Sequence, residues 1–182
     1  MDSRIQLIRP CSWEEVFLTW YQNEGDKQHW IDLAKSRGFA SWAEWRLTGY
    51  AHPFECEKAD WGLYEISNPS EVISEWYGGP FKTMIDLYYK GDKEKRFVEL
   101  ALETQVLEND AVKKISENYP EKSIISALEL SDGKIVVIEG MHRCFALAVM
   151  AAQNKPFQGS LTCAIGKSNL SELPIVGKNT TS

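Results

Sequence analysis

The chain has 182 residues and a formal net charge of −6, and its 43% apolar and 25% charged residues are typical of a globular protein. The negative charge argues against a protein whose main task is to coat nucleic acid, because that affinity comes from neutralisation of phosphates by Lys and Arg. No stretch is long and apolar enough for a transmembrane helix, and residues 1–13 lack the apolar core of a signal peptide. We therefore expect a cytoplasmic protein without a membrane partner.

The N-terminal third is rich in tryptophan, since six of the seven tryptophans lie in the first 61 residues. Ser12 is followed three residues later by Glu15, and Ser41 by Glu44, which are capping boxes that predict helix starts. Residues 26–38 predict another helix between these two, so 12–50 are expected to be helical. Aromatic residues at helical spacing favour an inward-packed layer over an exposed stacking platform. We assign residues 1–58 to an N-terminal helical extension.

The middle of the chain predicts one strand followed by several helices. Residues 61–67 alternate as in a short strand, and Asn68 and Pro69 then suit the cap and first position of a helix. Glu71, at the third helical position, is expected to take part in that cap. Further helices are predicted at 80–91 and, as one or two, between 92 and 119.

The pattern changes at residue 123. Two strand-like segments, 123–130 and 134–140, flank Ser131-Asp132-Gly133, a strong hairpin signal. A helix at 141–155 and a strand at 160–166 follow, and 171–182 is expected to be a tail with a disordered end. The four cysteines are widely spaced and contain no Cys-x-x-Cys pair, which predicts buried free thiols. The expected fold class is α+β, a small mixed sheet with helices.

One short segment, "VIEGMHRC" (137–144), carries the clearest functional signal. It places Gly140 between a strand and a helix, with Met141, His142 and Arg143 in the first helical turn. The start of a helix presents free N–H groups and a partial positive charge, and arginine is a bidentate phosphate donor, so an anion site is one interpretation. The other is structural: Arg143 pairs with Glu139 or another acid, and His142 packs in the core.

The hairpin, this motif and the following helix resemble the motif region of the ParB/sulfiredoxin-like superfamily, in which a strand ends in variants such as Gly-Cys-His-Arg. With "YEISNPSEV" as the first strand and helix start, the resemblance covers about residues 60–166, so we expect a domain at 59–170. It implies nucleotide binding through Gly140, Met141, His142 and Arg143, with ATP, ADP or CTP as the candidate nucleotides.

The branches of this superfamily differ in chemistry. Sulfiredoxins have a catalytic cysteine where this chain has Met141, which argues against sulfinic acid reduction because the reaction needs a thiolate. Chromosome-partitioning ParB proteins carry a helix-turn-helix after the motif, for which we expect no room here. A nuclease activity is disfavoured by the negative charge.

The branch with the closest motif layout contains free serine kinases, which transfer a phosphoryl group to a small hydroxyl substrate. Its Pro-x-Glu segment corresponds to Pro69-Ser70-Glu71, which implies Glu71 as catalytic base, and the acid before the glycine corresponds to Glu139. The resemblance thus implies a phosphotransferase that uses ATP or ADP, with Glu139 acting at the phosphates through Mg²⁺. The alternative is a non-catalytic nucleotide-sensing or protein-interaction module.

Overall fold

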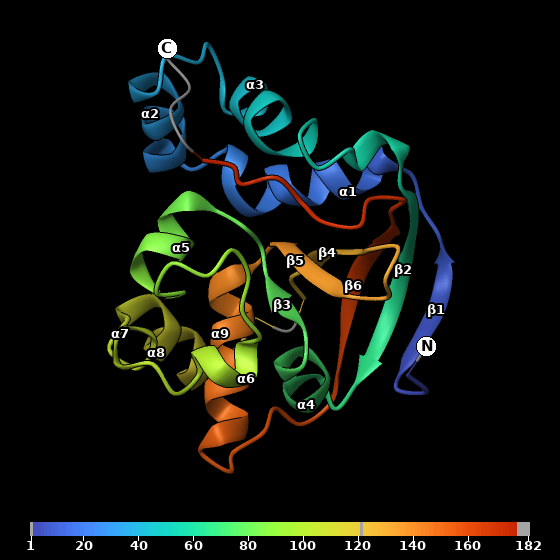
Figure 1. Ribbon diagram of the computed structural model, residues 1–182, viewed down its shortest axis with the longest axis vertical. Helices are drawn as coiled ribbons and strands as arrows, with labels where there is room; N and C mark the ends of the chain where they lie inside the picture. Colours follow the sequence, from blue (N-terminus) through green and yellow to red (C-terminus); the bar gives the residue numbers. More distant parts are fainter. Residues whose placement is uncertain (1, 121, 178–182) are drawn as a thin grey trace.

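A mixed six-stranded sheet forms the centre of an α+β fold in the computed structural model, which describes residues 2–120 and 122–177 (Figure 1). The strand order is β1-β2-β6-β4-β5-β3, in which β4 and β6 are parallel, β3 and β5 are parallel, and the other neighbours are antiparallel. The strands are β1 (Ile5–Pro10), β2 (Asp60–Ser67), β3 (Tyr77–Gly78), β4 (Ile125–Glu129), β5 (Ile135–Glu139) and β6 (Ser160–Lys167). The predicted fold class is confirmed.

One face of the sheet is covered by the tryptophan-rich segment, which we call the N-terminal layer (residues 13–51; Figure 1). It consists of α1 (Trp13–Trp20), the π-helical turn η1 (Tyr21–Gly25), α2 (Gln28–Ser36), α3 (Trp42–Arg46) and the π-helical turn η2 (Leu47–Ala51), and the 3₁₀ turn η3 (Cys56–Lys58) follows it. Trp20, Trp42 and Trp45 are buried together with Val136 and Ile138 of β5. Most of the tryptophans therefore pack inward, as predicted.

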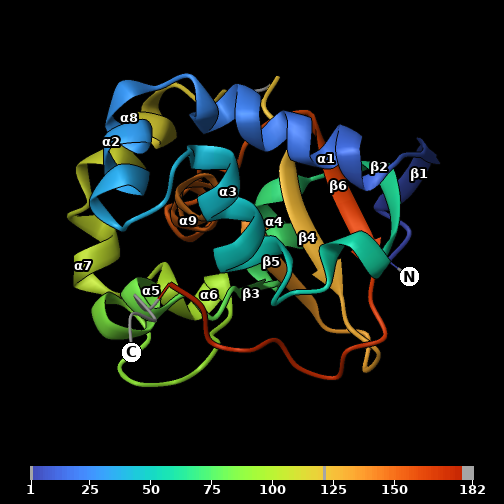
Figure 2. The same cartoon turned by 90° about the horizontal axis from the view of Figure 1, so that it is seen from above.

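The other face of the sheet is covered by α9 (Met141–Ala152) and the helices around it. These are α4 (Pro69–Ser74), α5 (Lys82–Leu87), α6 (Phe97–Leu100), α7 (Thr104–Leu107) and α8 (Asp110–Glu117). Eight residues of α9 are buried, which explains why its sequence is apolar nearly all round. Figure 2 looks along α9, with α2 and α3 in front of its end, so the start of α9 points towards the N-terminal layer.

Local signals predicted several of these elements well. Ser12 Oγ accepts from the Glu15 N–H and Ser41 Oγ from the Glu44 N–H, so both caps are confirmed. The hairpin is also confirmed: β4 and β5 are antiparallel, and Gly133 at the turn has a φ of 85° that suits glycine.

Other local predictions were wrong. Asn68 adopts a left-handed backbone conformation and its side chain caps nothing in the described structure, so the expected cap of α4 with Glu71 does not form. The segment 92–119 contains three short helices instead of one or two. Strand β1 was not predicted, although it pairs along β2 and makes the N-terminal segment part of the sheet.

The described part of the expected tail is packed onto the fold. Leu173 and Val176 are buried in the cluster under the N-terminal layer, and Val176 forms an isolated bridge with Phe81. The expected disordered end falls on residues 178–182, outside the described residues. In the part of the chain that the structure covers, no helix has the length and apolar character needed to span a membrane.

Candidate functional site

The turn between β5 and α9 has the local structure that the motif predicts. β5 ends at Glu139, Gly140 takes a φ of 97°, and α9 begins at Met141. A side chain at Gly140 would be strained at this φ, and its Cβ would lie 2.9 Å from the Arg143 guanidinium. Glycine therefore allows the chain to turn while Arg143 passes close to the backbone.

Arg143 forms a bidentate ion pair with Glu139. Its Nη2 donates to both Glu139 carboxylate oxygens at 2.7 Å, and its Nη1 donates to the Ile124 carbonyl at 3.0 Å. The two side chains are only 10% and 11% exposed. Burial opposes the charge of Arg143, but the adjacent Glu139 carboxylate raises its pKa, so the guanidinium remains charged. Of the two interpretations of this arginine, the structure shows the one with a carboxylate partner.

His142 is half-buried and has no side-chain hydrogen-bond partner among the described residues; its ring lies 6.2 Å from that of Phe145. Burial lowers its pKa, while Glu24 opposes this change, so the imidazole is neutral at neutral pH. Met141 is 7% exposed and belongs to the core cluster around α9.

The half-buried imidazole of His142 predicts that the stability of the fold depends on pH. The pKa of His142 is lower in the folded than in the unfolded chain, so as the pH falls below about 6.5 the unfolded chain binds the proton first. The free energy of unfolding is therefore highest above pH about 6.5 and declines below it. We expect His142→Gln to flatten this part of the profile of unfolding free energy, measured by urea denaturation between pH 7.5 and 5. His29→Gln, at an exposed position, should keep the wild-type slope. An unchanged slope in His142→Gln would contradict the assignment.

Gly140, Met141, His142 and Arg143 lie at the wall of a cavity of about 570 Å³. Its other walls come from the N-terminal layer, from β5, from α5 and the residue before it, from α8 and from the segment before β4. Aromatic side chains in the lining are Trp20, Trp30, Trp45, Tyr50 and Phe81. The volume is within the range of small-molecule sites, roughly 300–1,000 Å³. The predicted motif is therefore at a cavity, but most of the lining belongs to residues that the sequence analysis did not assign to a site.

The described lining has an excess of positive charge. The basic side chains are Lys27, Arg37, Arg46 and Arg143, and the acidic ones are Glu24 and Glu139. With His142 neutral, this corresponds to a formal net charge of +2, in contrast to the negative charge of the whole chain. The cavity therefore favours an anionic ligand.

Glu139 also contacts the N-terminal layer. Asn23 Nδ2, in the turn η1, donates a hydrogen bond to Glu139 Oε2 at 3.4 Å. Glu24, the next residue of η1, binds Arg46 through its Oε2 atom. Burial raises the pKa of Glu139, and Arg143 acts against this rise. Glu139 is paired with Arg143 in this arrangement, and its role as a Mg²⁺ ligand stays a prediction. Residues 2–120 and 122–177 contain no cluster of three or more potential metal ligands.

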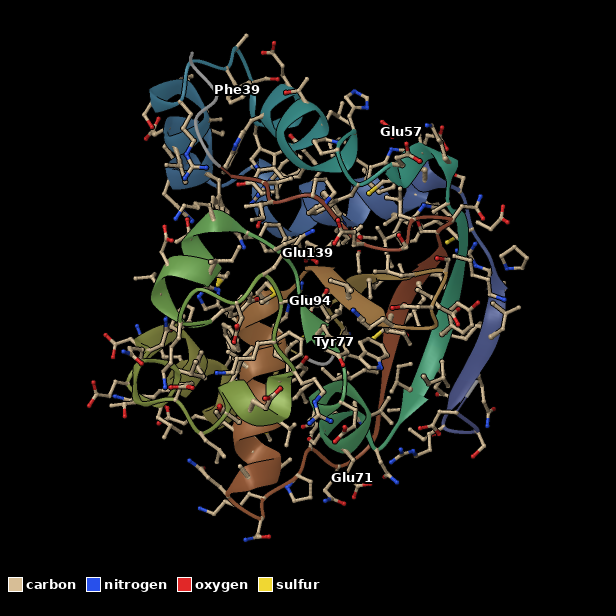
Figure 3. All side chains as sticks on the ribbon, in the orientation of Figure 1. Phe39, Glu57, Glu71, Tyr77, Glu94 and Glu139 are labelled. Atoms are coloured by element: carbon tan, nitrogen blue, oxygen red, sulfur yellow. The ribbon has the colours of Figure 1, made fainter. Side chains whose placement is uncertain are left out.

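The structure does not bring Glu71 and Glu139 together. Figure 3 places Glu139 near the middle of the view, next to the N-terminal layer, and Glu71, in the first turn of α4, at the bottom. The Glu71 side chain is 63% exposed and binds Arg4 Nη1 at 3.0 Å, and it does not line the cavity. The start of α4, which follows β2, is therefore outside the cavity, and Glu71 is not positioned to act as a base there.

The thiols are also not placed for chemistry. Cys56, Cys144 and Cys163 are buried and Cys11 is half-buried, which agrees with the prediction of free cysteines. Burial raises the pKa of Cys144 well above its usual range and that of Cys163 to about 12, so both are protonated at neutral pH.

The sequence indicated the segment that forms much of the cavity wall, but not which of its residues face the cavity. The density of tryptophan marked the N-terminal layer, yet helical spacing does not distinguish a ring that is wholly in the core from one at a cavity wall. Arg37 gave no local signal at all.

Comparison with protein-family models gives no match to this chain, and neither curated proteins nor solved structures show a significant similarity to it.

Proposed function

We propose that the protein binds a nucleotide in this cavity, with the base against aromatic side chains of the N-terminal layer and the phosphates near its cations. The observation that carries the proposal is the combination of aromatic rings and excess positive charge in one cavity of about 570 Å³. A base needs a flat apolar surface, and phosphates need donors and positive charge.

Two aromatic side chains are suited to contact a base. Trp30 and Phe81 line the cavity and are half-buried, whereas Trp20, Trp45 and Tyr50 are buried. Leu33 and Met84 add apolar surface to the same walls. An aromatic ring that keeps part of its surface accessible offers a platform for stacking.

Membership in the ParB/sulfiredoxin-like superfamily is also a proposal. It is supported by the order of the elements: strand β2 and the start of α4, then the β4–β5 hairpin, the glycine turn, α9 and β6. Two features depart from the resemblance, since Arg143 is paired with Glu139 and Glu71 lies outside the cavity.

These departures limit the proposal to nucleotide binding, with ATP, ADP and CTP as the first candidates. Transfer of a phosphoryl group to a hydroxyl substrate would need a carboxylate that orients the attacking oxygen. Glu71 is outside the cavity, and the two carboxylates in the described lining, Glu24 and Glu139, each bind an arginine. The nucleotide-sensing alternative therefore has the better structural support.

A thermal-shift titration with ATP, ADP, CTP and GTP, with and without Mg²⁺, tests the proposal. At a ligand concentration of 100 Kd, binding adds about 2.7 kcal/mol to the stability, which corresponds to a rise in Tm of several degrees. We expect Trp30→Leu to weaken binding by about fivefold or more, because stacking of a base on an aromatic ring contributes about 1–3 kcal/mol.

The matched control is Trp13→Leu, a half-buried tryptophan of the same layer that lies outside the cavity lining. It should keep the wild-type affinity. If no nucleotide raises the Tm of the folded wild-type protein, nucleotide binding is excluded. If both tryptophan variants lose affinity equally, the loss reflects the stability of the layer and not contact with a base.

A further inference from the structure

Two arginines of the N-terminal layer stack against Trp45 at the cavity wall. The guanidinium carbon of Arg37, just after α2, lies 4.8 Å from the centre of the Trp45 ring, and that of Arg46 lies 4.3 Å from it. Both arginines line the cavity. Their polar contacts differ, and the difference indicates which of them is available to a ligand.

Arg46 is already paired. Its Nε donates to Glu24 Oε2 at 2.8 Å, its Nη2 contacts the same oxygen, and its guanidinium also lies over the rings of Trp30 and Tyr50. Arg143 is paired with Glu139. Both charges are therefore neutralised within the protein.

Arg37 has no carboxylate within ion-pair distance among residues 2–120 and 122–177. Its one side-chain hydrogen bond in this part of the chain runs from Nη1 to Tyr50 Oη, at 3.4 Å. A positive charge just beyond the C-terminal end of α2 interacts favourably with the helix dipole, which is a structural reason for a cation at Arg37. This interaction uses none of the N–H groups of the guanidinium. The stacking on Trp45 orients a guanidinium whose remaining N–H donors have no acceptor among the described residues.

We propose that Arg37 binds the phosphate group of the ligand, together with the Tyr50 hydroxyl. This inference rests on the proposed nucleotide binding and assigns the phosphates to one end of the cavity. The Tyr50 oxygen accepts from Arg37, which leaves its own O–H free to donate, and its ring lies 5.6 Å from that of Phe81. Thr83, two residues after Phe81, is also in the lining. A planar guanidinium with neighbouring hydroxyls matches the geometry of phosphate oxygens.

The start of α9 is the weaker candidate for the phosphates. The Glu139 carboxylate lies directly before it and disfavours a second anion there, although Arg143 compensates part of that charge. Lys27, the other unpaired cation of the described lining, is at the opposite end of α2 from Arg37, about 15 Å away at 1.5 Å per residue. Variants of these two residues therefore distinguish the two ends of the cavity.

Calorimetric titration with ATP and with adenosine tests the assignment. We expect Arg37→Gln to weaken ATP binding by about tenfold or more, because hydrogen bonds to charged groups are strong, and to leave adenosine binding unchanged within about twofold. Tyr50→Phe keeps the ring and should weaken ATP binding by a smaller factor, also without effect on adenosine. Lys35→Gln, on the exposed part of α2 and outside the lining, should bind both ligands like the wild type, and Lys27→Gln should weaken ATP binding less than Arg37→Gln does.

The inference is overturned if Arg37→Gln binds ATP normally, if Lys27→Gln loses more affinity than Arg37→Gln, or if Arg37→Gln loses adenosine and ATP equally. Tyr50→Phe provides the same comparison should Arg37→Gln not fold. A wild-type protein that binds neither ligand overturns the proposed function itself, whereas wild-type binding with no selective loss in these variants overturns only the placement of the phosphates.

Discussion

Replacing Arg143 with methionine is expected to lower the free energy of unfolding by about 3–5 kcal/mol, because it leaves the buried Glu139 carboxylate without its counter-charge. The Ile124 carbonyl loses a donor in the same change. Urea denaturation at pH 7.5 measures the loss.

A double variant separates the cost of an unpaired charge from the loss of side-chain packing. Glu139→Leu together with Arg143→Met removes both charges, so most of the lost stability should return. Arg9→Gln breaks an ion pair between half-exposed side chains and should cost far less. If Arg143→Met is as mild as Arg9→Gln, or if the double variant is no more stable than Arg143→Met, the ion pair does not have the role assigned to it.

Replacing Trp20 with alanine is expected to cost about 3–5 kcal/mol, because a large side chain that is 2% exposed is removed from the contact between the N-terminal layer and the sheet. Trp20 Nε1 also donates to Ser126 Oγ at 2.9 Å, and Ser126 on β4 is fully buried. The substitution thus creates a cavity and leaves a buried hydroxyl without its donor.

Denaturation followed both by tryptophan fluorescence and by far-ultraviolet circular dichroism measures this effect. We expect one coincident transition at lower denaturant concentration, because the layer and the sheet share a core. Trp20→Phe keeps most of the packing and should lie between Trp20→Ala and the wild type, and Leu18→Ala, at an exposed position of α1, should change little. Two separate transitions in the wild type would show that the layer unfolds on its own.

The ion pair changes the interpretation of the His-Arg motif. A cation in the first turn of a helix is unfavourable to the helix dipole, so a negative partner is needed. That partner is Glu139, four residues earlier, which Arg143 reaches because Gly140 turns the chain between them. Residues 140–143 form one wall of the cavity, where the neutral His142 imidazole has no hydrogen-bond partner in the part of the chain that the structure describes.

The sequence predicted the elements that are formed by interactions between residues close together in the chain, and it missed one that depends on distant residues. The caps at Ser12 and Ser41 and the turn at Gly133 involve residues within four positions of each other, so a local pattern predicts them. Strand β1 has one apolar side chain that is buried and two that are exposed, Leu7 and Ile8. Its existence depends on hydrogen bonds to β2, more than fifty residues away, and no local pattern contains that information.

The candidate site shows the same division. The sequence by itself determined that a glycine turn with Met141, His142 and Arg143 begins a buried helix, because turn geometry and apolar periodicity are local. Only the tertiary structure decided that Arg143 is paired with Glu139, that Glu71 is remote, and that Arg37 faces the cavity without a described acidic partner. Whether a charged side chain is paired or available depends on residues that the fold brings close, and such neighbours are far apart along the chain.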